Sequence, residues 1–267
     1  MEPIWYNFVK ERYFKKFPDH KEEDFERDLD KYYQIPVFNA CENIHQVMTD
    51  YSKRNELPDA EENYVVTADQ VLTPESHWIM RMLTQFHITE AFKAMKINLE
   101  DDNIKEQSLG KGTPGRIAKL YLGDTPEDTT ELFSGRWNKE PYIACFPNTD
   151  NNHSIITKEV DVVACCSHHF LPFSTFNGGK AIIEYIPGEY VLGISKISRF
   201  INWCARRGWL QEDLTNYIGN TLKRIAATED VHVKLEGLVH GCEVFRGANS
   251  KAGNLTTEFK SGVFKNM

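Results

Sequence analysis

The spacing of apolar residues changes twice in the second half of the chain, from a strand pattern to a helix pattern and back. This feature most limits the folds that the chain can adopt. The segments 154–166 and 180–187 are rich in β-branched residues, and 231–239 alternates apolar with polar residues, so all three are predicted strands. Between the second and third segments, apolar residues recur every three or four positions over 197–204 and 214–225, which predicts two amphipathic helices. The second half of the chain is therefore predicted to run as strands, then two helices, then strands again.

The first part of the chain carries a charged extension and then a helix. Residues 1–70 are rich in Lys, Glu, Asp and Tyr, and we expect a charged helix over Lys15–Tyr33 that is either solvated or docked on another surface. Thr73 followed by Pro74 is typical of a helix N-terminus, because threonine caps the first turn and proline fits the first helical position. Apolar residues at helical spacing extend this helix over about 74–96.

A second helix start is predicted at Thr113 and Pro114. Arg116 and Lys119 are three residues apart, so they share one face of this short helix, while apolar residues such as Leu120 are expected to face inward. The two cations form either a solvated basic face or part of an anion site.

Composition restricts the class of protein. A chain of 267 residues with 41% hydrophobic residues can bury a core as one large domain, or as a domain with an extension. The formal net charge of −8 argues against a nucleic-acid binder, but it leaves room for a local basic pocket. Since no apolar run is long enough to span a bilayer and the first residues do not resemble a signal peptide, we expect a soluble, cytoplasmic protein without a membrane partner.

Two clusters of cysteine and histidine carry the chemistry. Cys166 and His169 have a Cys-x-x-His spacing that lets both side chains reach one ion from a turn, and Cys242 follows the last predicted strand. If the clusters meet, these three residues form a Cys2His site, whose fourth zinc position stays open for water as in catalytic sites. His168 and His240 then remain as proton-transfer groups beside the metal. The alternative is that these histidines are only hydrogen-bonded.

Cations gather around a third feature, a helix N-terminus predicted within 193–199. Ser195 is the expected cap of this helix, and its first N–H groups are available to an anion. The number of cations fits a triphosphate. The five cations assigned to this anion site are Arg116, Lys119, Lys196, Arg199 and Arg246.

Gln211 and Glu212 lie at the start of the second predicted helix. A carboxylate can accept hydrogen bonds from both the N1–H and the exocyclic amine of guanine, and a neighbouring amide can bind another edge of the base. Glu212 and Gln211 are therefore candidates for reading guanine. The alternative for Glu212 is a first-turn acid that only favours the helix dipole.

Six motifs in this order resemble the GTP cyclohydrolase I family, from near residue 80 to the C-terminus: TPGRIAKLY, CSHHFLPF, YIPGEYVLGISKISRF, ARRGWLQEDLT, VHGCEVFRGA and LTTEFKSGVF. The resemblance implies an α+β tunnelling fold (T-fold), in which an antiparallel β-sheet carries helices on one face. It also implies a ring-shaped homo-oligomer, typically a decamer of two stacked pentamers, with active sites between subunits. The implied domains are an extension over 1–70 and a catalytic domain over 71–267, with N-terminal helices over 71–125 and the T-fold over 150–267.

The resemblance assigns a role to each candidate residue. The implied zinc ligands are Cys166, His169 and Cys242. The implied catalytic histidines are His168 and His240. The implied guanine-reading pair is Gln211 and Glu212. The residues implied to hold the triphosphate are Arg116, Lys119, Ser195, Lys196, Arg199 and Arg246.

Two positions depart from the family's pattern. Ser167 stands where the family usually has Glu, which removes a charge beside the metal. Cys165 precedes Cys166 and offers a competing thiolate. Only Cys166 keeps the family's register with His169.

The implied reaction is the zinc-dependent hydrolysis of GTP at C8, which releases formate and forms 7,8-dihydroneopterin triphosphate, a first step toward folate, tetrahydrobiopterin or 7-deazaguanines. One alternative is another T-fold enzyme such as a 7-cyano-7-deazaguanine reductase. The cysteine–histidine clusters and the five cations argue against it, because that substrate carries no triphosphate. A second alternative is a non-catalytic ring protein that binds guanine nucleotides. The presence of every predicted ligand and both histidines argues against that.

Overall fold

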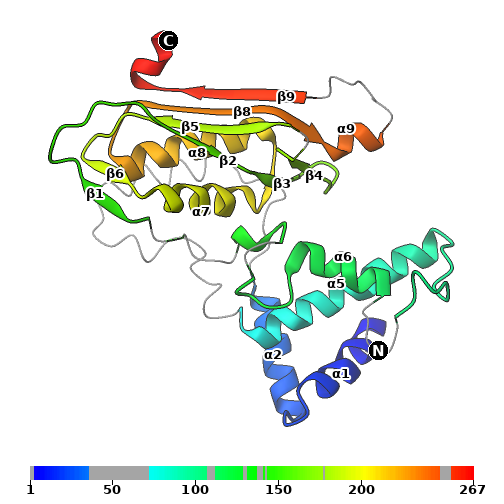
Figure 1. Ribbon diagram of the computed structural model, residues 1–267. Coiled ribbons are helices and arrows are strands. Elements are labelled where there is room, and N and C mark those ends of the chain that lie inside the picture. Colours follow the sequence, from blue (N-terminus) through cyan, green and yellow to red (C-terminus); the bar gives the residue numbers. More distant parts are fainter. Residues whose placement is uncertain are drawn as a thin grey trace. The chain divides into compact units, whose positions relative to one another are not determined.

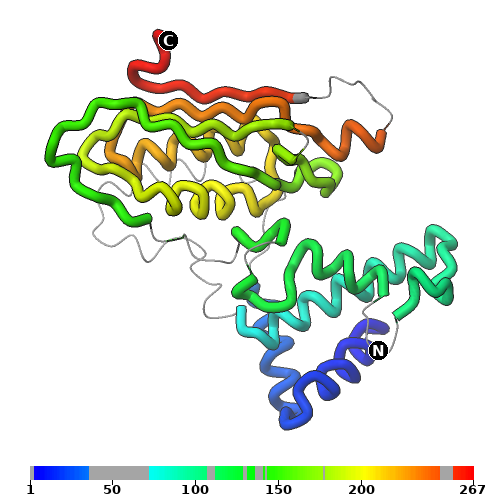
Figure 2. The backbone as a smooth tube through the Cα atoms, in the orientation of Figure 1, coloured from blue at the N-terminus to red at the C-terminus, as the bar shows by residue number. Residues whose placement is uncertain are grey.

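The computed structural model describes residues 3–35, 72–106, 112–128, 131–136, 141, 143–176, 178–246 and 254–267 (Figures 1 and 2). The remainder of the predicted extension, residues 1–2 and 36–70, lies outside this described part. Within the described residues, no helix combines the length and the apolar character needed to cross a bilayer. The described residues divide into a helical unit, which holds those up to 35 and from 72 to 136, and a sheet unit, which holds those from 141 onward.

The described helices of the helical unit are α1 (Ile4–Lys16), α2 (Glu22–Gln34), α5 (Pro74–Ala94) and α6 (Gly112–Leu122). The single helix predicted over Lys15–Tyr33 is wrong, because the chain breaks between α1 and α2. Pro18 follows Phe17, and a proline disfavours the helical conformation in the residue before it. Phe17 accordingly leaves the helix, with φ −124° and ψ 74°.

Helices α1 and α2 pack on α5 around a shared apolar core. Burying a large apolar side chain contributes about 1.5–3 kcal/mol, so a core of this size holds the three helices together. Its buried members are Val9, Tyr13, Phe25, Leu29, Trp78, Ile79, Met82 and Leu83. Helices α1 and α2 are therefore docked on α5 and do not form a solvated extension.

Helix α5 confirms the prediction for 74–96. Thr73 caps it by accepting a hydrogen bond from the Ser76 N–H at 3.2 Å, and Pro74 occupies the first turn. The cap signal in the sequence therefore fixed the start of this helix.

Helix α6 begins earlier than the sequence predicts. It starts at Gly112, and the hydroxyl of Thr113 donates to the Asn103 carbonyl at 3.1 Å instead of capping the helix. Leu120, which we expected to face inward, is 52% exposed.

The described strands all belong to the sheet unit. Its strands are β1 (Cys145–Pro147), β2 (Ile156–Val160), β3 (Val163–Cys166), β4 (Pro172–Ser174), β5 (Lys180–Tyr185), β6 (Tyr190–Leu192), β7 (Gly208–Trp209), β8 (Val231–His240) and β9 (Asn254–Lys260). Its helices are α7 (Ile194–Ala205), α8 (Gln211–Ala226) and α9 (Gly241–Phe245).

The main sheet has the strand order β2-β5-β8-β4-β3-β7, and β9 also pairs with β8. All of these pairs are antiparallel except β3 with β7. The segment 154–166 divides into β2 and β3, which pair with different neighbours, and the two predicted helices are α7 and α8. Figure 1 shows both helices along one face of the sheet. The structure thus confirms a mixed α+β fold with a mainly antiparallel sheet.

Candidate active site

A tight turn after β3 carries the first cysteine–histidine cluster. The Phe170 N–H donates to the Cys166 carbonyl, and the Cys166 N–H donates to the Leu171 carbonyl, each at 2.8 Å. Phe170 adopts the left-handed conformation with φ 55°, which is uncommon for a residue other than glycine. This turn folds His169 back toward Cys166, as the Cys-x-x-His spacing predicts.

The second cluster is brought to this turn by β8 and α9. Strand β8 pairs with β4, and Cys242 follows in the first turn of α9. The Sγ atoms of Cys242 and Cys166 lie 3.8 Å apart. One ligand atom from each of Cys166, His169 and Cys242 lies within 4.8 Å of the other two, so this group could hold a metal ion.

Gly241 allows the two clusters to approach this closely. A Cβ atom at Gly241 would lie 3.0 Å from the Pro172 carbonyl oxygen and 3.3 Å from Cβ of Leu171. Burial raises the pKa of the Cys242 thiol, and its hydrogen bond with Cys166 raises it further. A bound cation would act in the opposite direction, because a metal deprotonates the thiols that coordinate it.

Cys165 does not belong to the group that includes Cys166. Successive side chains of a strand point to opposite faces, and Cys165 and Cys166 are neighbours in β3. The Cys165 side chain is fully buried, and its sulfur contacts the Cys166 carbonyl at 3.8 Å. Ser167, the departure from the family's pattern, is 8% exposed, and its N–H donates to the Trp209 carbonyl.

We call Cys166, His169 and Cys242 the metal group. His240 is held in a defined orientation beside it. Its ring stacks on Phe173, with ring centroids 4.5 Å apart and an angle of 7° between the planes. Its Nε2 atom lies 2.7 Å from the Oε1 atom of Gln211. Burial lowers the pKa of His240, and the carboxylates of Glu212 and Glu243 oppose this shift. The stacking partner Phe173 was missed by the sequence analysis, although it lies in the motif CSHHFLPF.

His168 and Glu212 are exposed, whereas Gln211 is buried. His168 lies at the outer side of the turn, with its ring perpendicular to that of His169 at a centroid distance of 6.3 Å. Glu212 is in the first turn of α8, where its carboxylate is close enough to influence the pKa of His240. Gln211 is only 1% exposed, which differs from the expectation that its amide is open to a base.

The predicted anion site is distributed over several elements. Ser195 does not cap α7, because Gly193 occupies the N-cap and Ser195 lies inside the first turn. Lys196 and Arg199 follow in the same part of α7. Arg246 lies near the metal group instead, where its guanidinium donates to Nε2 of His169 at 3.0 Å.

Arg116 and Lys119 belong to α6 in the helical unit. Arg116 is exposed. The ammonium group of Lys119 is bound by Asp124, and this bond raises the pKa of Lys119. Asp124 also pairs with Arg81.

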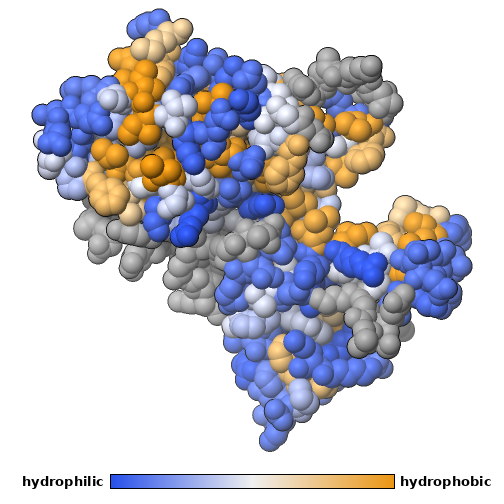
Figure 3. Space-filling model, viewed as in Figure 1, coloured by the Kyte–Doolittle hydropathy of each residue, from blue (hydrophilic) through white to orange (hydrophobic). Residues whose placement is uncertain are grey.

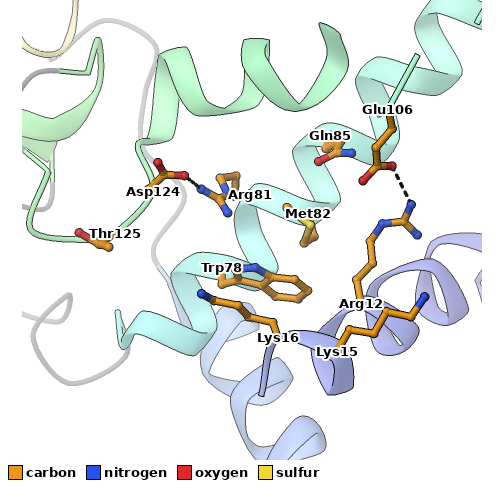
Figure 4. Close-up of a pocket in the computed structure, with 10 residues that line it drawn as sticks. All are labelled: Arg12, Lys15, Lys16, Trp78, Arg81, Met82, Gln85, Glu106, Asp124 and Thr125. Carbon is orange, nitrogen blue, oxygen red and sulfur yellow. Dashed lines mark hydrogen bonds and ion pairs between the residues drawn. The ribbon is translucent and has the colours of Figure 1, made fainter. Parts of the chain in front are cut away.

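A cavity of about 560 Å³ lies within the helical unit between α1 and α5 (Figure 4). Two of its cations are already neutralised, because Arg12 pairs with Glu106 at 3.1 Å and Arg81 pairs with Asp124. The only described group of potential metal ligands lies elsewhere, in the sheet unit. We therefore assign the candidate active site to the sheet unit.

The sheet unit and its site define an α+β protein with a Cys2His group that could hold a metal ion, beside a half-buried histidine. The sequence model of the GTP cyclohydrolase I family matches residues 88–267, and the chain belongs to that family. Helices α1 and α2 precede the matched residues.

Curated relatives carry the same name, GTP cyclohydrolase 1. The protein of Edwardsiella ictaluri (strain 93-146) is 33% identical over 181 residues, which cover 67% of this chain and 74% of the relative. The protein of Blochmanniella pennsylvanica (strain BPEN) is 31% identical over 192 residues, which cover 71% of this chain and 79% of the relative. That of Yersinia pseudotuberculosis serotype O:1b (strain IP 31758) is 32% identical over 183 residues, or 68% of this chain and 75% of the relative.

Proposed function

We propose that this protein hydrolyses GTP at C8, releases formate and forms 7,8-dihydroneopterin triphosphate. The name of the relatives supports GTP as the substrate. The single structural observation that carries the proposal is the group formed by Cys166, His169 and Cys242. Two thiolates and an imidazole suit a borderline-soft ion better than they suit magnesium or calcium.

We propose zinc as the metal of this group. Two Zn–S bonds of about 2.3 Å at a tetrahedral angle place their sulfur atoms about 3.8 Å apart. The Sγ atoms of Cys166 and Cys242 have this separation, 3.8 Å. When bound, zinc supplies a nucleophile at neutral pH, because it lowers the pKa of a water in its open position.

The residues around this group supply binding and proton transfer. Glu212 is exposed at the start of α8, so its carboxylate is available to the N1–H and amine of guanine. His240 and His168 are the groups proposed to protonate the imidazole ring of the base while it opens. Arg246, whose guanidinium donates to Nε2 of His169, is proposed to contact the triphosphate.

The other cations are proposed to come from a neighbouring subunit. Lys196 and Arg199 lie at the start of α7, directly after β6, whereas Cys166 pairs with β7 beyond the end of that helix (Figure 1). A 12-residue helix is about 18 Å long, so the two groups lie at opposite ends of α7. We propose a closed ring of identical subunits in which the start of one α7 lies near the Cys2His group of another.

The activity can be tested with purified protein, zinc and GTP, by measuring released formate and the fluorescence of the oxidised pterin. We expect turnover in the native protein and the loss of both bound zinc and turnover in Cys242→Ser. Cys165→Ser is the matched control, because Cys165 faces away from the group. Full activity in Cys242→Ser would refute the three-ligand assignment.

The shared site can be tested by mixing inactive subunits. Cys242→Ser removes a metal ligand, and Lys196→Ala removes a phosphate contact at the other end of α7. When the two variants are co-expressed at equal levels, about a quarter of the sites would receive both native residues if each site uses two subunits. Activity near that fraction is expected, and no recovery in mixed rings would refute the sharing of residues.

A further inference from the structure

Gln211 lies inside the protein, where all its polar atoms are bonded to other residues. Its amide nitrogen is 3.2 Å from the Leu235 carbonyl oxygen, 3.1 Å from the Leu255 carbonyl oxygen and 3.0 Å from Oγ1 of Thr257. Its amide oxygen is 2.7 Å from Nε2 of His240. With 1% of its surface exposed, the side chain offers no open edge to a base.

These neighbours fix which way the amide points. A backbone carbonyl can only accept a hydrogen bond, so the side of the amide that faces Leu235 and Leu255 must be the NH2 group. The amide oxygen must then face His240. Since an amide oxygen only accepts, Nε2 of His240 must carry a proton and donate it.

A second layer of contacts holds Gln211 in place. The hydroxyl of Thr257 lies 2.6 Å from the hydroxyl of Thr215, which in turn donates to the Gln211 carbonyl at 2.8 Å. These contacts tie the first turn of α8 to β9. The amide is therefore held both through its own bonds and through the backbone that carries it.

We propose that Gln211 is a positioning residue that selects the Nε2–H tautomer of His240 and leaves Nδ1 as the nitrogen that first takes up a proton from water and then passes it to the substrate. The hydrogen bond from Gln211 fixes the imidazole edge, and stacking on Phe173 fixes its plane. Guanine recognition then belongs to Glu212, whose carboxylate is exposed, and not to Gln211. The catalytic part of this inference rests on the proposed GTP hydrolysis, whereas the tautomer does not.

Kinetics of paired variants distinguish positioning from base recognition. Gln211→Met keeps the length of the side chain but removes every hydrogen bond to His240. We expect kcat to fall about 10- to 100-fold, a part of the 10²–10⁴-fold effect of a general acid or base, with KM for GTP changed by less than about threefold. Glu212→Gln is the matched comparison and is expected to raise KM. A raised KM with an unchanged kcat in Gln211→Met would overturn the proposal.

A second measurement does not depend on activity. Solid-state NMR of native protein labelled with ¹⁵N-histidine distinguishes the two tautomers, and the His240 signals are identified by their loss in His240→Ala. We expect a protonated Nε2 and an unprotonated Nδ1, and the opposite tautomer would overturn the proposal. If the native protein does not turn over GTP, the proposed function fails while this measurement still decides which tautomer His240 adopts.

Discussion

Replacing Gly241 by alanine is expected to weaken zinc binding while leaving the rest of the fold intact. Gly241 lies between His240 and the proposed ligand Cys242, where α9 passes close to the segment that follows the first cluster. An added Cβ would lie 3.0 Å from the Pro172 carbonyl oxygen. Because Gly241 is in the first turn of a helix and needs no left-handed conformation, the contact with that oxygen is the main consequence of the change.

The size of the effect follows from this contact. An ordinary Cβ contact begins near 3.4 Å, so α9 must move by a few tenths of an ångström, which exceeds the tolerance of about 0.2 Å for metal–ligand distances. Adding a methyl group to a packed site costs about 1–3 kcal/mol. If Cys242 moves away from Cys166 to relieve the contact, this cost appears as zinc affinity weakened about 5- to 150-fold.

Competition with a chromophoric chelator measures the zinc affinity, and the absorption of the cobalt-substituted protein reports the geometry of the ligands. Gly219→Ala is the matched control, since it adds the same methyl group in the same unit but away from the metal ligands. Its Cβ would meet the ring of Phe259, between α8 and β9. Zinc affinity of Gly241→Ala within twofold of the native value would refute the reasoning.

The remaining predictions concern stability and the metal. Gly219→Ala is expected to lower the free energy of unfolding by about 1–3 kcal/mol, because its Cβ would lie 2.2 Å from a ring atom of Phe259. A higher free energy of unfolding than that of the native protein, measured by urea titration, would show that helix propensity dominates. Cys165→Ser is expected to retain zinc at the native stoichiometry, as measured by atomic absorption, and Cys166→Ser to lose it. Burial lowers the pKa of His77, so the folded chain excludes a proton that the unfolded chain takes up below about pH 6.5. The free energy of unfolding therefore falls as the pH drops below that value. The variant His77→Gln is expected to show a smaller fall when the free energy is measured by urea unfolding.

The sequence predicted the metal group because its determinants are local. Cys166 and His169 are three residues apart on one turn, and Cys242 closely follows a strand. The prediction therefore needed only one assumption about distant parts of the chain, that the turn and the end of this strand lie together. The break at Pro18 was also visible in the sequence, and the helix predicted through it ignored the effect of proline on the preceding residue.

The role of Gln211 could not be predicted in this way. Its hydrogen-bond partners Leu235, Leu255 and Thr257 are 24 to 46 residues away in the sequence. They reach Gln211 only because α8 packs on β8 and β9. The motif indicated that Gln211 lies near the site. Whether its side chain faces solvent or the interior depends on this packing.

The exposed apolar residues beside the metal group illustrate the same limit. Phe245 of α9 is 77% exposed and Val244 is 45% exposed, and Figure 3 shows the apolar surface over α9. Periodicity cannot predict this, because α9 has only five residues and no full amphipathic repeat.

An irregularity in β8 decides on which face of the sheet His240 lies. The pairing with β9 advances from Leu235 to Leu238 on β8, but only from Thr257 to Leu255 on β9, so β8 carries one extra residue. Gly237 takes up this bulge with φ 66°, a conformation that suits glycine. Side chains alternate along a strand, so the bulge changes the parity of every position after it. Val231, Val233 and Leu235 are buried before the bulge and Leu238 after it, which places His240 on the buried face, where Gln211 of α8 meets it. Without the extra residue, the alternation that predicts the strand would turn His240 away from Gln211.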